Sequence, residues 1–317
     1  MIALIVRRLL WMIPVVWAAA TLIWIFMFLI PGDPARILAG ERTDPEIIEK
    51  VRAEWGLNRS APYRYGLFLW KLVHLDLGTS YVYRKPVSEV IFRGLFHTFF
   101  LAVAAMALAV IVGLLLGTLS AARRGSWLDG AALAASTAGI SLPTFWVGMM
   151  LILIFSSWLG WFPVSGYGEG PGFGSWRLPG LAHLVLPAIT LAFFSSGYLA
   201  RVTRASLLEE STQEYMRAAR ARGLSFPAAL TRHVLPNSLL PVVTLAGMHF
   251  GALLGGAIAT ETVFAWPGIG TVIYQALNGR DLPVVEGGAI ALTATFLLVN
   301  LAVDISYTLL DPRIRTR

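Results

Sequence analysis

Cysteine is absent from this chain of 317 residues, which excludes a disulfide framework and thiolate metal sites. Histidine is also scarce, and no two histidines have the His-Glu-x-x-His spacing of a zinc site. We therefore expect no metal on this chain. The histidines, all far apart, are His74, His97, His183, His233 and His249.

Lysine occurs only as Lys50, Lys71 and Lys85, and none of them completes a Gly-x-x-x-x-Gly-Lys-Ser/Thr phosphate loop. A Gly-x-Ser-x-Gly nucleophile elbow is missing as well. We therefore expect no catalytic residue, no ATPase site and no cofactor on this chain.

Charged residues make up only 14% of the chain, against about 25% in ordinary soluble domains, and 56% of the residues are hydrophobic. A soluble fold with one large core fits this composition poorly. The formal charge of +7 comes from basic residues that lie mostly beside apolar runs, as topology signals do. The pattern favours an integral membrane protein over one that binds nucleic acid.

Six apolar runs come near or exceed the roughly 17 to 25 residues that a helix needs to cross a bilayer. The sequence thus predicts an all-α membrane protein with six spans. The fourth run is the weakest, because Pro187 lies inside it. The runs are Leu9–Ile30, Thr98–Ala122, Leu128–Leu159, Leu184–Ala200, Leu239–Thr260 and Gly287–Leu310.

The first run could be a signal peptide or a retained span. It ends in Pro31-Gly32-Asp33-Pro34 and is longer than the apolar region of a signal peptide, which is roughly 7 to 15 residues. We interpret it as a retained span.

Arginine is unevenly distributed about these runs. Thirteen arginines precede the first run, follow the sixth, or lie between the second and third or the fourth and fifth runs. The opposite short loops hold only Arg177 and Arg280. Short cytoplasmic loops carry the excess of positive charge, so both termini are predicted to be cytoplasmic. The chain is then divided into residues 1–30 with the first span, an external segment 31–96, a five-helix core 97–310 that contains a cytoplasmic loop 201–240, and a cytoplasmic tail 311–317.

The external segment carries helical signals of its own. Thr43-Asp44-Pro45-Glu46 is a capping box that precedes an apolar face, and a second helix is expected over Tyr65–Leu75. These helices either cap the spans or form a docking platform for an external partner, and both interpretations stay open. The candidate contacts of such a platform are Thr43, Glu46, Ile47, Val51, Trp55 and Asp76.

Two features point to helix packing or to a pathway within the membrane. Gly247, Gly251 and Gly255 recur every four residues in the fifth span, which favours close helix contact over a direct role with a solute. Pro143 is expected to kink the third span, where a kink either shapes a pathway or accommodates neighbouring helices.

Ionisable groups are few within the spans. His249, Glu261 and Asp304 are the candidates, and a structural role is favoured for each of them. An ion-coupled secondary carrier, which needs such groups, is therefore kept as the alternative function. An intramembrane enzyme is the third class, but no catalytic constellation supports it.

The loop between the fourth and fifth runs holds six of the thirteen cytoplasmic arginines. Acidic residues from Glu209 to Glu214 are followed by basic residues up to Arg222, which matches the dipole of a helix. Gly223 then provides a natural end for this helix. The helix either lies on the membrane surface or inserts into the groove of a partner protein.

This loop resembles that of the membrane subunits of binding-protein-dependent ABC importers, which carry Glu-Ala-Ala, three residues, Gly, nine residues, and Ile-x-Leu-Pro. Here Arg217-Ala218-Ala219 precedes Gly223 by the same spacing, and nine residues lead from Gly223 to His233-Val234-Leu235-Pro236. Arg217 and His233 depart from the general pattern, and together with Tyr215 to Leu224 they resemble the dipeptide and oligopeptide branch. Further matches to that branch include Ser141 to Trp146, Pro267-Gly268-Ile269-Gly270 and Asp311-Pro312-Arg313.

The resemblance implies a permease of the type I ABC importer kind in the inner membrane, with a second homologous permease subunit, two cytoplasmic ATPase domains that hold ATP and Mg²⁺, and an external solute-binding protein. It also implies a coupling helix that docks on an ATPase subunit. Its residues would be Glu214, Tyr215, Arg217, Ala218, Ala219, Arg220, Gly223 and Leu224. No residue selects among dipeptides, oligopeptides, nickel chelates, glutathione and sugars as the solute.

Overall fold

The computed structural model describes residues 2–29, 35, 44–54, 58–168, 180–229, 232 and 234–310. Within these ranges the chain is helical, and the extended pairing is confined to an isolated bridge between Thr79 and Pro86. Helices long and apolar enough to cross a membrane are α1 (Ile2–Leu29), α5 (Val87–Ala122), α8 (Leu181–Glu210), α11 (Leu235–Gly256) and α14 (Leu282–Leu310). The all-α membrane fold is therefore confirmed.

The sixth span is a broken one. α6 (Trp127–Ser141) and α7 (Thr144–Leu151) with its π-helical continuation η1 (Ile152–Trp158) are bent from one another by 106°. The break falls at Leu142 and Pro143, because proline removes a backbone donor and disfavours a helical residue before it. Six spans result if the bent pair is counted as one. A kink was predicted at Pro143, and the structure shows a complete break of the helix at this position.

The helices extend beyond the predicted spans. α5 begins at Val87, so residues 87–96, which were assigned to the external segment, form the first turns of a membrane helix. α8 continues through Pro187 to Glu210, ten residues beyond the predicted end at Ala200. Helix ends follow backbone hydrogen bonding, whereas apolar runs mark only the part that lipid can cover.

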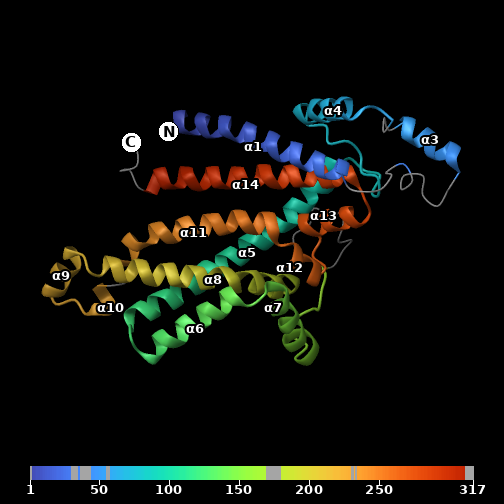
Figure 1. Cartoon of the computed structure of the whole chain (residues 1–317). Helices are drawn as coiled ribbons and strands as arrows, with labels where there is room; N and C mark the ends of the chain where they lie inside the picture. The colour runs from blue at the N-terminus through green and yellow to red at the C-terminus, as the bar shows by residue number, and fades with distance from the viewer. Residues whose placement is uncertain are drawn as a thin grey trace.

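Figure 1 shows the long helices side by side, with the start of α1 and the end of α14 at the same end of the bundle as α9 (Glu214–Ala221) and α10 (Phe226–Ala229). We call this the α9 end. The opposite α13 end carries α3 (Pro45–Glu54), α4 (Ala61–Val73), α12 (Ile258–Val263) and α13 (Ile269–Asn278). The two short helices between α11 and α14 were not predicted.

The core lies between α5, α8 and α11, where α5 and α8 approach closely at two glycines. A methyl group added to Gly113 or Gly117 would lie 2.5 Å from the Cβ atom of Leu199 or Thr203. α1 is peripheral, because it packs mainly along α14. Its Thr21 hydroxyl also shares a 2.7 Å hydrogen bond with the Tyr65 hydroxyl of α4.

Candidate coupling surface and passage

α9 is a short helix that lies at one end of the bundle (Figure 1). It ends as a Schellman motif, since Gly223 has φ +88° and the Leu224 N–H donates to the Ala219 carbonyl at 3.4 Å. The same two residues, Ala219 and Leu224, belong to one apolar cluster, which is the contact that usually accompanies this motif. The helix therefore ends where the sequence predicted.

The two faces of α9 have different surroundings. Met216 is 2% exposed and packs with Ala121 of α5 and Leu207 of α8. Glu214, Tyr215, Arg217 and Ala218 are exposed. This amphipathic arrangement anchors one face of α9 to the bundle and leaves the other available to a partner.

The structure corrects the predicted docking residues in part. Ala219 is 8% exposed and packs inward, so it anchors α9 and does not face a partner. Leu224 is half-buried against the same cluster. The side chain of Arg220 lies outside the described residues. Sequence spacing placed the two alanines together, but adjacent helical residues point about 100° apart and do not share a face.

Tyr215 joins α9 to the end of α8. Its hydroxyl donates to Glu210 Oε2 at 2.7 Å, and partial burial raises the pKa of this tyrosine. The phenol therefore remains a hydrogen-bond donor at neutral pH.

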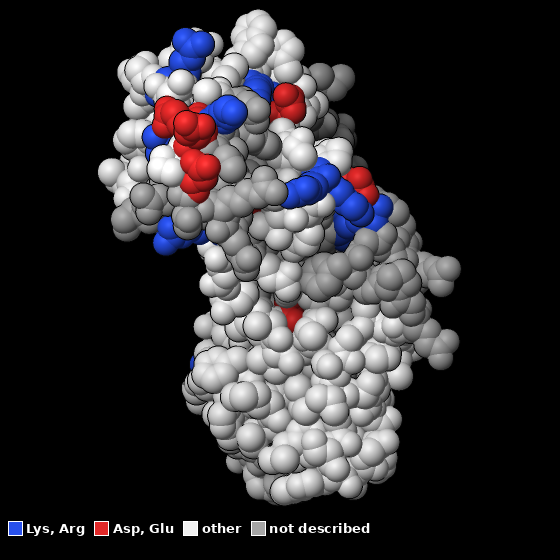
Figure 2. All heavy atoms as spheres, turned by 90° about the vertical axis from the view of Figure 1, so that its right-hand side faces the viewer, with Lys and Arg blue, Asp and Glu red and all other residues white. Residues whose placement is uncertain are grey.

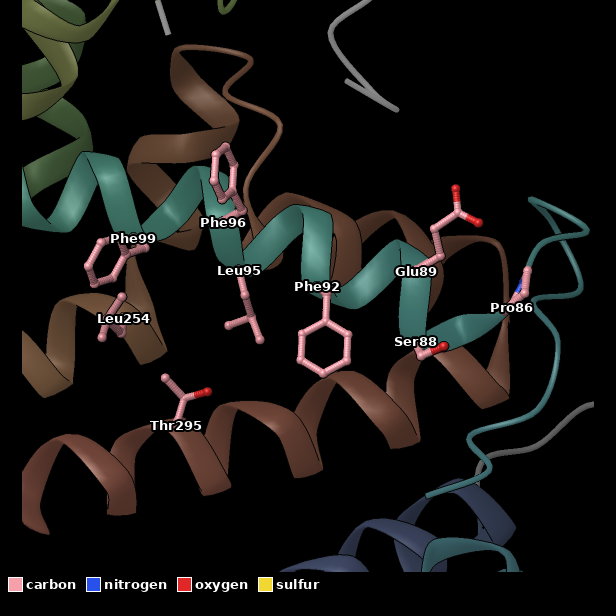
Figure 3. Close-up of a pocket in the computed structure, with 9 residues that line it drawn as sticks. All are labelled: Pro86, Ser88, Glu89, Phe92, Leu95, Phe96, Phe99, Leu254 and Thr295. Carbon is pink, nitrogen blue, oxygen red and sulfur yellow. The ribbon is translucent and has the colours of Figure 1, made fainter. Parts of the chain in front are cut away.

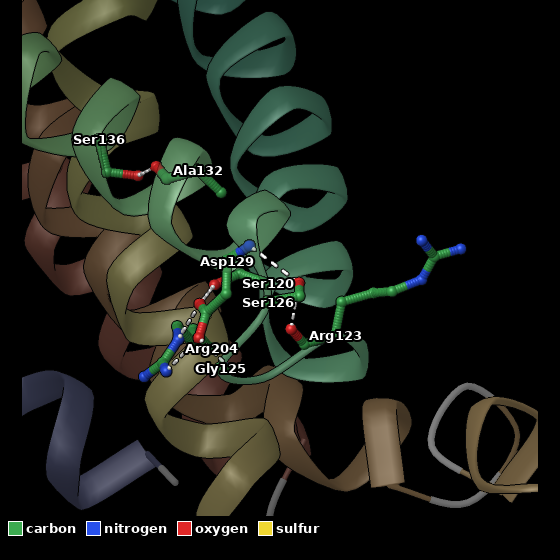
Figure 4. A network of polar contacts seen from close by, with 8 residues as sticks. All are labelled: Ser120, Arg123, Gly125, Ser126, Asp129, Ala132, Ser136 and Arg204. Atoms are coloured by element: carbon green, nitrogen blue, oxygen red, sulfur yellow. Dashed lines mark hydrogen bonds and ion pairs between the residues drawn. The ribbon is translucent and has the colours of Figure 1, made fainter.

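A polar network lies where α5, α6 and α8 meet near the α9 end (Figure 4). The Arg204 guanidinium of α8 donates to both carboxylate oxygens of Asp129, with Nε to Oδ1 and Nη2 to Oδ2 at 2.9 Å each. The Gly125 N–H donates to Oδ2 at 2.9 Å, and the Ser120 hydroxyl of α5 donates to Oδ1. Asp129, in the first turn of α6, is only 4% exposed, so its charge is almost fully enclosed by donors.

An open groove of about 670 Å³ lies between α5, α11 and α14 (Figure 3). We call it the aromatic groove, because three phenylalanines of α5 contribute to it. Phe92 and Leu95 point toward α14, whereas the Glu89 carboxylate points away from that space. The lining residues are Pro86, Ser88, Glu89, Phe92, Leu95, Phe96, Phe99, Leu254 and Thr295. The volume falls in the range of about 300–1,000 Å³ that holds small molecules.

The glycine row of α11 makes two contacts with α14. A methyl group at Gly247 would lie 2.3 Å from Val303 Cγ2, and one at Gly251 would lie 3.3 Å from a ring carbon of Phe296. A methyl group at Gly255 would meet no described atom within 4 Å, so close packing does not account for that glycine.

The ionisable groups of the spans occupy packed or paired positions. The His249 ring lies 5.9 Å from the Phe194 ring and 5.1 Å from the Tyr198 ring, measured between centroids. Asp304 pairs with Arg8 of α1 at 3.0 Å. This ion pair is in keeping with the structural role favoured for Asp304.

The two helices predicted between α1 and α5 are present as α3 and α4, although α4 begins four residues before and ends two residues before the predicted bounds, and only part of the predicted contact set is described. α3 begins at Pro45, and the Glu46 N–H donates to Asp44 Oδ1 at 3.0 Å, so Asp44 supplies a cap. Asp76 accepts from the Gly78 N–H at 2.9 Å and so holds a turn. Thr43 and Trp55 lie outside the described residues, as do the side chains of Ile47 and Val51.

Charge is unevenly spread over the α13 end. In Figure 2, Lys, Arg, Asp and Glu gather over the upper part, at the height of α3 and α4 in Figure 1. The lower part, toward α7 and η1, shows an almost uncharged surface. Carboxylates such as Glu46 and Glu49 are exposed on α3, so this part of the surface carries both signs of charge.

Buried carboxylates hold this end together, and their partners were not foreseen. Glu261 of α12 is fully buried and accepts from the Thr98 hydroxyl of α5 at 2.5 Å and from the Thr271 N–H of α13 at 2.9 Å. Burial raises the pKa of Glu261 to about 6. Asp281 likewise accepts from the backbone N–H of Tyr81 at 3.0 Å. Burial, with the nearby carboxylates Glu286 and Asp281, raises the pKa of Tyr81 to about 12.

The described part of the chain is thus a helical bundle with up to six potential spans, an open groove and an anchored helix on an inter-span loop, which defines an integral membrane subunit. Comparison with protein families gives the finer assignment. The family described as "Binding-protein-dependent transport system inner membrane component" matches residues 113–316, and the N-terminal part of such membrane components matches residues 1–102. The chain belongs to this family and is a permease subunit of an ABC importer.

Relatives agree with this assignment, and a solved structure has a similar fold. A peptide transport system permease protein of Brucella abortus is 42% identical over 315 residues, which cover 99% of each chain. The glutathione transport system permease protein GsiC of Pectobacterium atrosepticum is 39% identical over 310 residues, or 98% of each chain. The fold is similar to a chain of the MetNI methionine ABC transporter in an inward-facing conformation, with a TM-score of 0.58 and 21% identity over 71% of this chain and 98% of that one.

Proposed function

We propose that this chain forms half of the passage of an ATP-driven importer for di- or oligopeptides or a similar small solute, and that α9 couples it to an ATPase subunit. The observation that carries this proposal is the two-faced α9. Its Met216 face is anchored in the bundle, its Arg217 face is exposed, and Gly223 fixes its end. A force applied to the exposed face would therefore reach α5 and α8 through packed side chains.

The partners follow from the family. A second homologous permease subunit would complete the passage, two cytoplasmic ATPase domains would hold ATP and Mg²⁺, and an external solute-binding protein would deliver the solute. The α9 end would face the cytoplasm, in keeping with the arginines of the α8–α11 connection, and both termini would be cytoplasmic. The α13 end, with the charged surface of α3 and α4, would receive the binding protein in the periplasm.

ATP-driven closure of the ATPase pair would move α9 and tilt the attached spans, so that the passage opens outward, and release of phosphate would reverse this motion. The aromatic groove is our candidate for this subunit's part of the passage wall. Its phenylalanines offer apolar surface to side chains of a peptide, and Phe92 and Phe99 are 60% and 48% exposed.

The principal experiment is purification with the neighbouring subunits and reconstitution into liposomes. We expect ATPase subunits to copurify and ATP to drive solute uptake in the presence of the binding protein, with no uptake by the chain alone. Uptake by the isolated chain in response to a proton or sodium gradient would overturn the proposal in favour of an ion-coupled carrier. The binding protein's bound solute, identified after purification, decides between peptides and glutathione.

The groove is tested separately. We expect Phe99→Ala to lower solute uptake, because a wall contact is lost, while the complex still assembles. Phe145→Ala is the matched control, since Phe145 of α7 is 46% exposed and lies outside the groove. Equal effects of the two substitutions would remove the groove from the passage.

A further inference from the structure

α8 contacts both α5 and α6 closely at glycines. Besides the two glycines of α5, Gly139 of α6 faces the backbone of α8, where an added methyl group would lie 2.6 Å from the Phe193 carbonyl oxygen. Gly197 of α8 faces α6 in return, with the Ser136 carbonyl oxygen 2.6 Å from such a methyl group. Contacts of this kind bring helix backbones together and leave little room for one helix to slide past another.

α9 is joined directly to two of these three helices. A turn of three residues, Ser211 to Gln213, links α8 to α9, and backbone hydrogen bonds such as Thr212 N–H to Glu209 O at 3.1 Å close it. The apolar cluster beneath α9 takes members from α5 and α8. Among the described residues of that cluster, none belongs to α6. Motion of α9 thus reaches α5 and α8 directly through this cluster, whereas it reaches α6 only through the contacts of α6 with α5 and α8.

The Asp129–Arg204 pair is the charged, two-bond link between α6 and α8 near the α9 end. It lies in the first turn of α6 and in the last two turns of α8, and its two parallel hydrogen bonds fix orientation as well as distance. Ser120 of α5 donates to the same carboxylate, so the one side chain ties three helices together. Lysine in place of Arg204 would keep the positive charge but lose the two parallel hydrogen bonds, because its ammonium group lacks the planar geometry of a guanidinium.

We propose that the Asp129–Arg204 pair is a latch that makes α6 follow α8 when α9 moves, and that it thereby sets how many ATP molecules are hydrolysed for each solute imported. Both residues are positioning residues. α6 is the first half of the broken span and leads directly into the break at Pro143, so the latch would pass the motion of α9 through α6 to the second half, α7 and η1. This inference rests on the proposed function.

The first test measures ATP hydrolysed per solute imported in liposomes that contain the full complex. We expect Asp129→Asn and Arg204→Lys to raise this ratio at least about fivefold, the lower end of a typical coupling effect. The double variant Asp129→Asn with Arg204→Gln should be no worse than either single one, because both act through one contact. Arg201→Gln is the matched control, because Arg201 lies one turn away on α8 and donates one exposed hydrogen bond of 2.7 Å to Thr137 of α6. The ATP hydrolysed per solute imported should be unchanged in this variant.

If the pair only stabilised the fold, the substitutions would lower the yield or melting temperature of the complex. The complex that still assembled would then hydrolyse the same amount of ATP per solute imported as the unsubstituted one. That outcome would overturn the latch. Failure of the proposed function looks different, because the unsubstituted complex would then show no ATP-driven uptake at all.

The second test is independent of whether Asp129 variants assemble. Since the chain has no cysteine, Thr137→Cys and Arg201→Cys place a unique pair of thiols on α6 and α8, which a short bifunctional reagent can bridge. If α6 and α8 move as one body, bridging leaves uptake unchanged. Loss of uptake on bridging, with recovery after cleavage of the reagent, would show that the helices shift against each other and would overturn the proposal.

Discussion

Replacement of Gly223 examines the role of α9 most directly. At φ +88° a residue with a Cβ atom is strained by about 1–2 kcal/mol, while the added carbon would find no atom of the described residues within 4 Å. The cost is therefore one of backbone conformation and not of steric overlap. It disfavours the capped form of α9 by about 5- to 30-fold. The contact between Ala219 and Leu224 should loosen with it.

The expected order of activity among variants at position 223 follows from how well each side chain tolerates a positive φ. Asn at position 223 should retain most solute-stimulated ATP hydrolysis and uptake, Ala should lose part of both, and β-branched Val should lose most. Gly160→Val is the control, because Gly160 has φ +65° and equally open surroundings but follows η1, far along the chain from α9. If Gly223→Val left stimulated hydrolysis and uptake undiminished in the assembled complex, the assigned role of this helix would be wrong.

Three further outcomes are expected. Glu261 binds its proton more tightly in the folded than in the unfolded chain, because burial raises its pKa from 4.5 to about 6. The free energy of unfolding should therefore fall by about 2 kcal/mol as the pH rises through this range. Glu261→Gln should abolish this pH dependence in melting curves of the purified chain. Gly247→Ala should destabilise the chain by about 1–3 kcal/mol through overlap with Val303, whereas Gly255→Ala should be neutral, and equal melting temperatures would refute this packing argument. Deletion of residues 43–55 should raise the concentration of binding protein needed for half-maximal uptake, and an unchanged concentration would leave α3 as a cap only.

Features encoded by a single segment were accessible from the sequence. The length of each apolar run gives the number of spans, and Pro143 marks the break because a proline acts on its own neighbours. The end of α9 at Gly223 is equally local, since it depends on the one residue that adopts a positive φ without strain.

Features that depend on pairs of distant residues were not accessible. Asp129 and Arg204 are 75 positions apart, and Thr98 and Glu261 are 163 apart, so no window of sequence contains both partners. The inward direction of Ala219 also needed the position of the bundle beneath α9. Helical periodicity gives the relative directions of side chains, but the packing partner decides which direction is inside.

The place of α1 beside α14 has a consequence for biogenesis. α1 ends at Leu29 and its main neighbour begins at Leu282, about 250 residues later in the chain. At roughly 5–20 residues per second, synthesis of that stretch takes about 10–50 s. Among the described spans, α1 is therefore the one that waits longest for its main neighbour, and until then it is held in the bilayer by its own hydrophobicity.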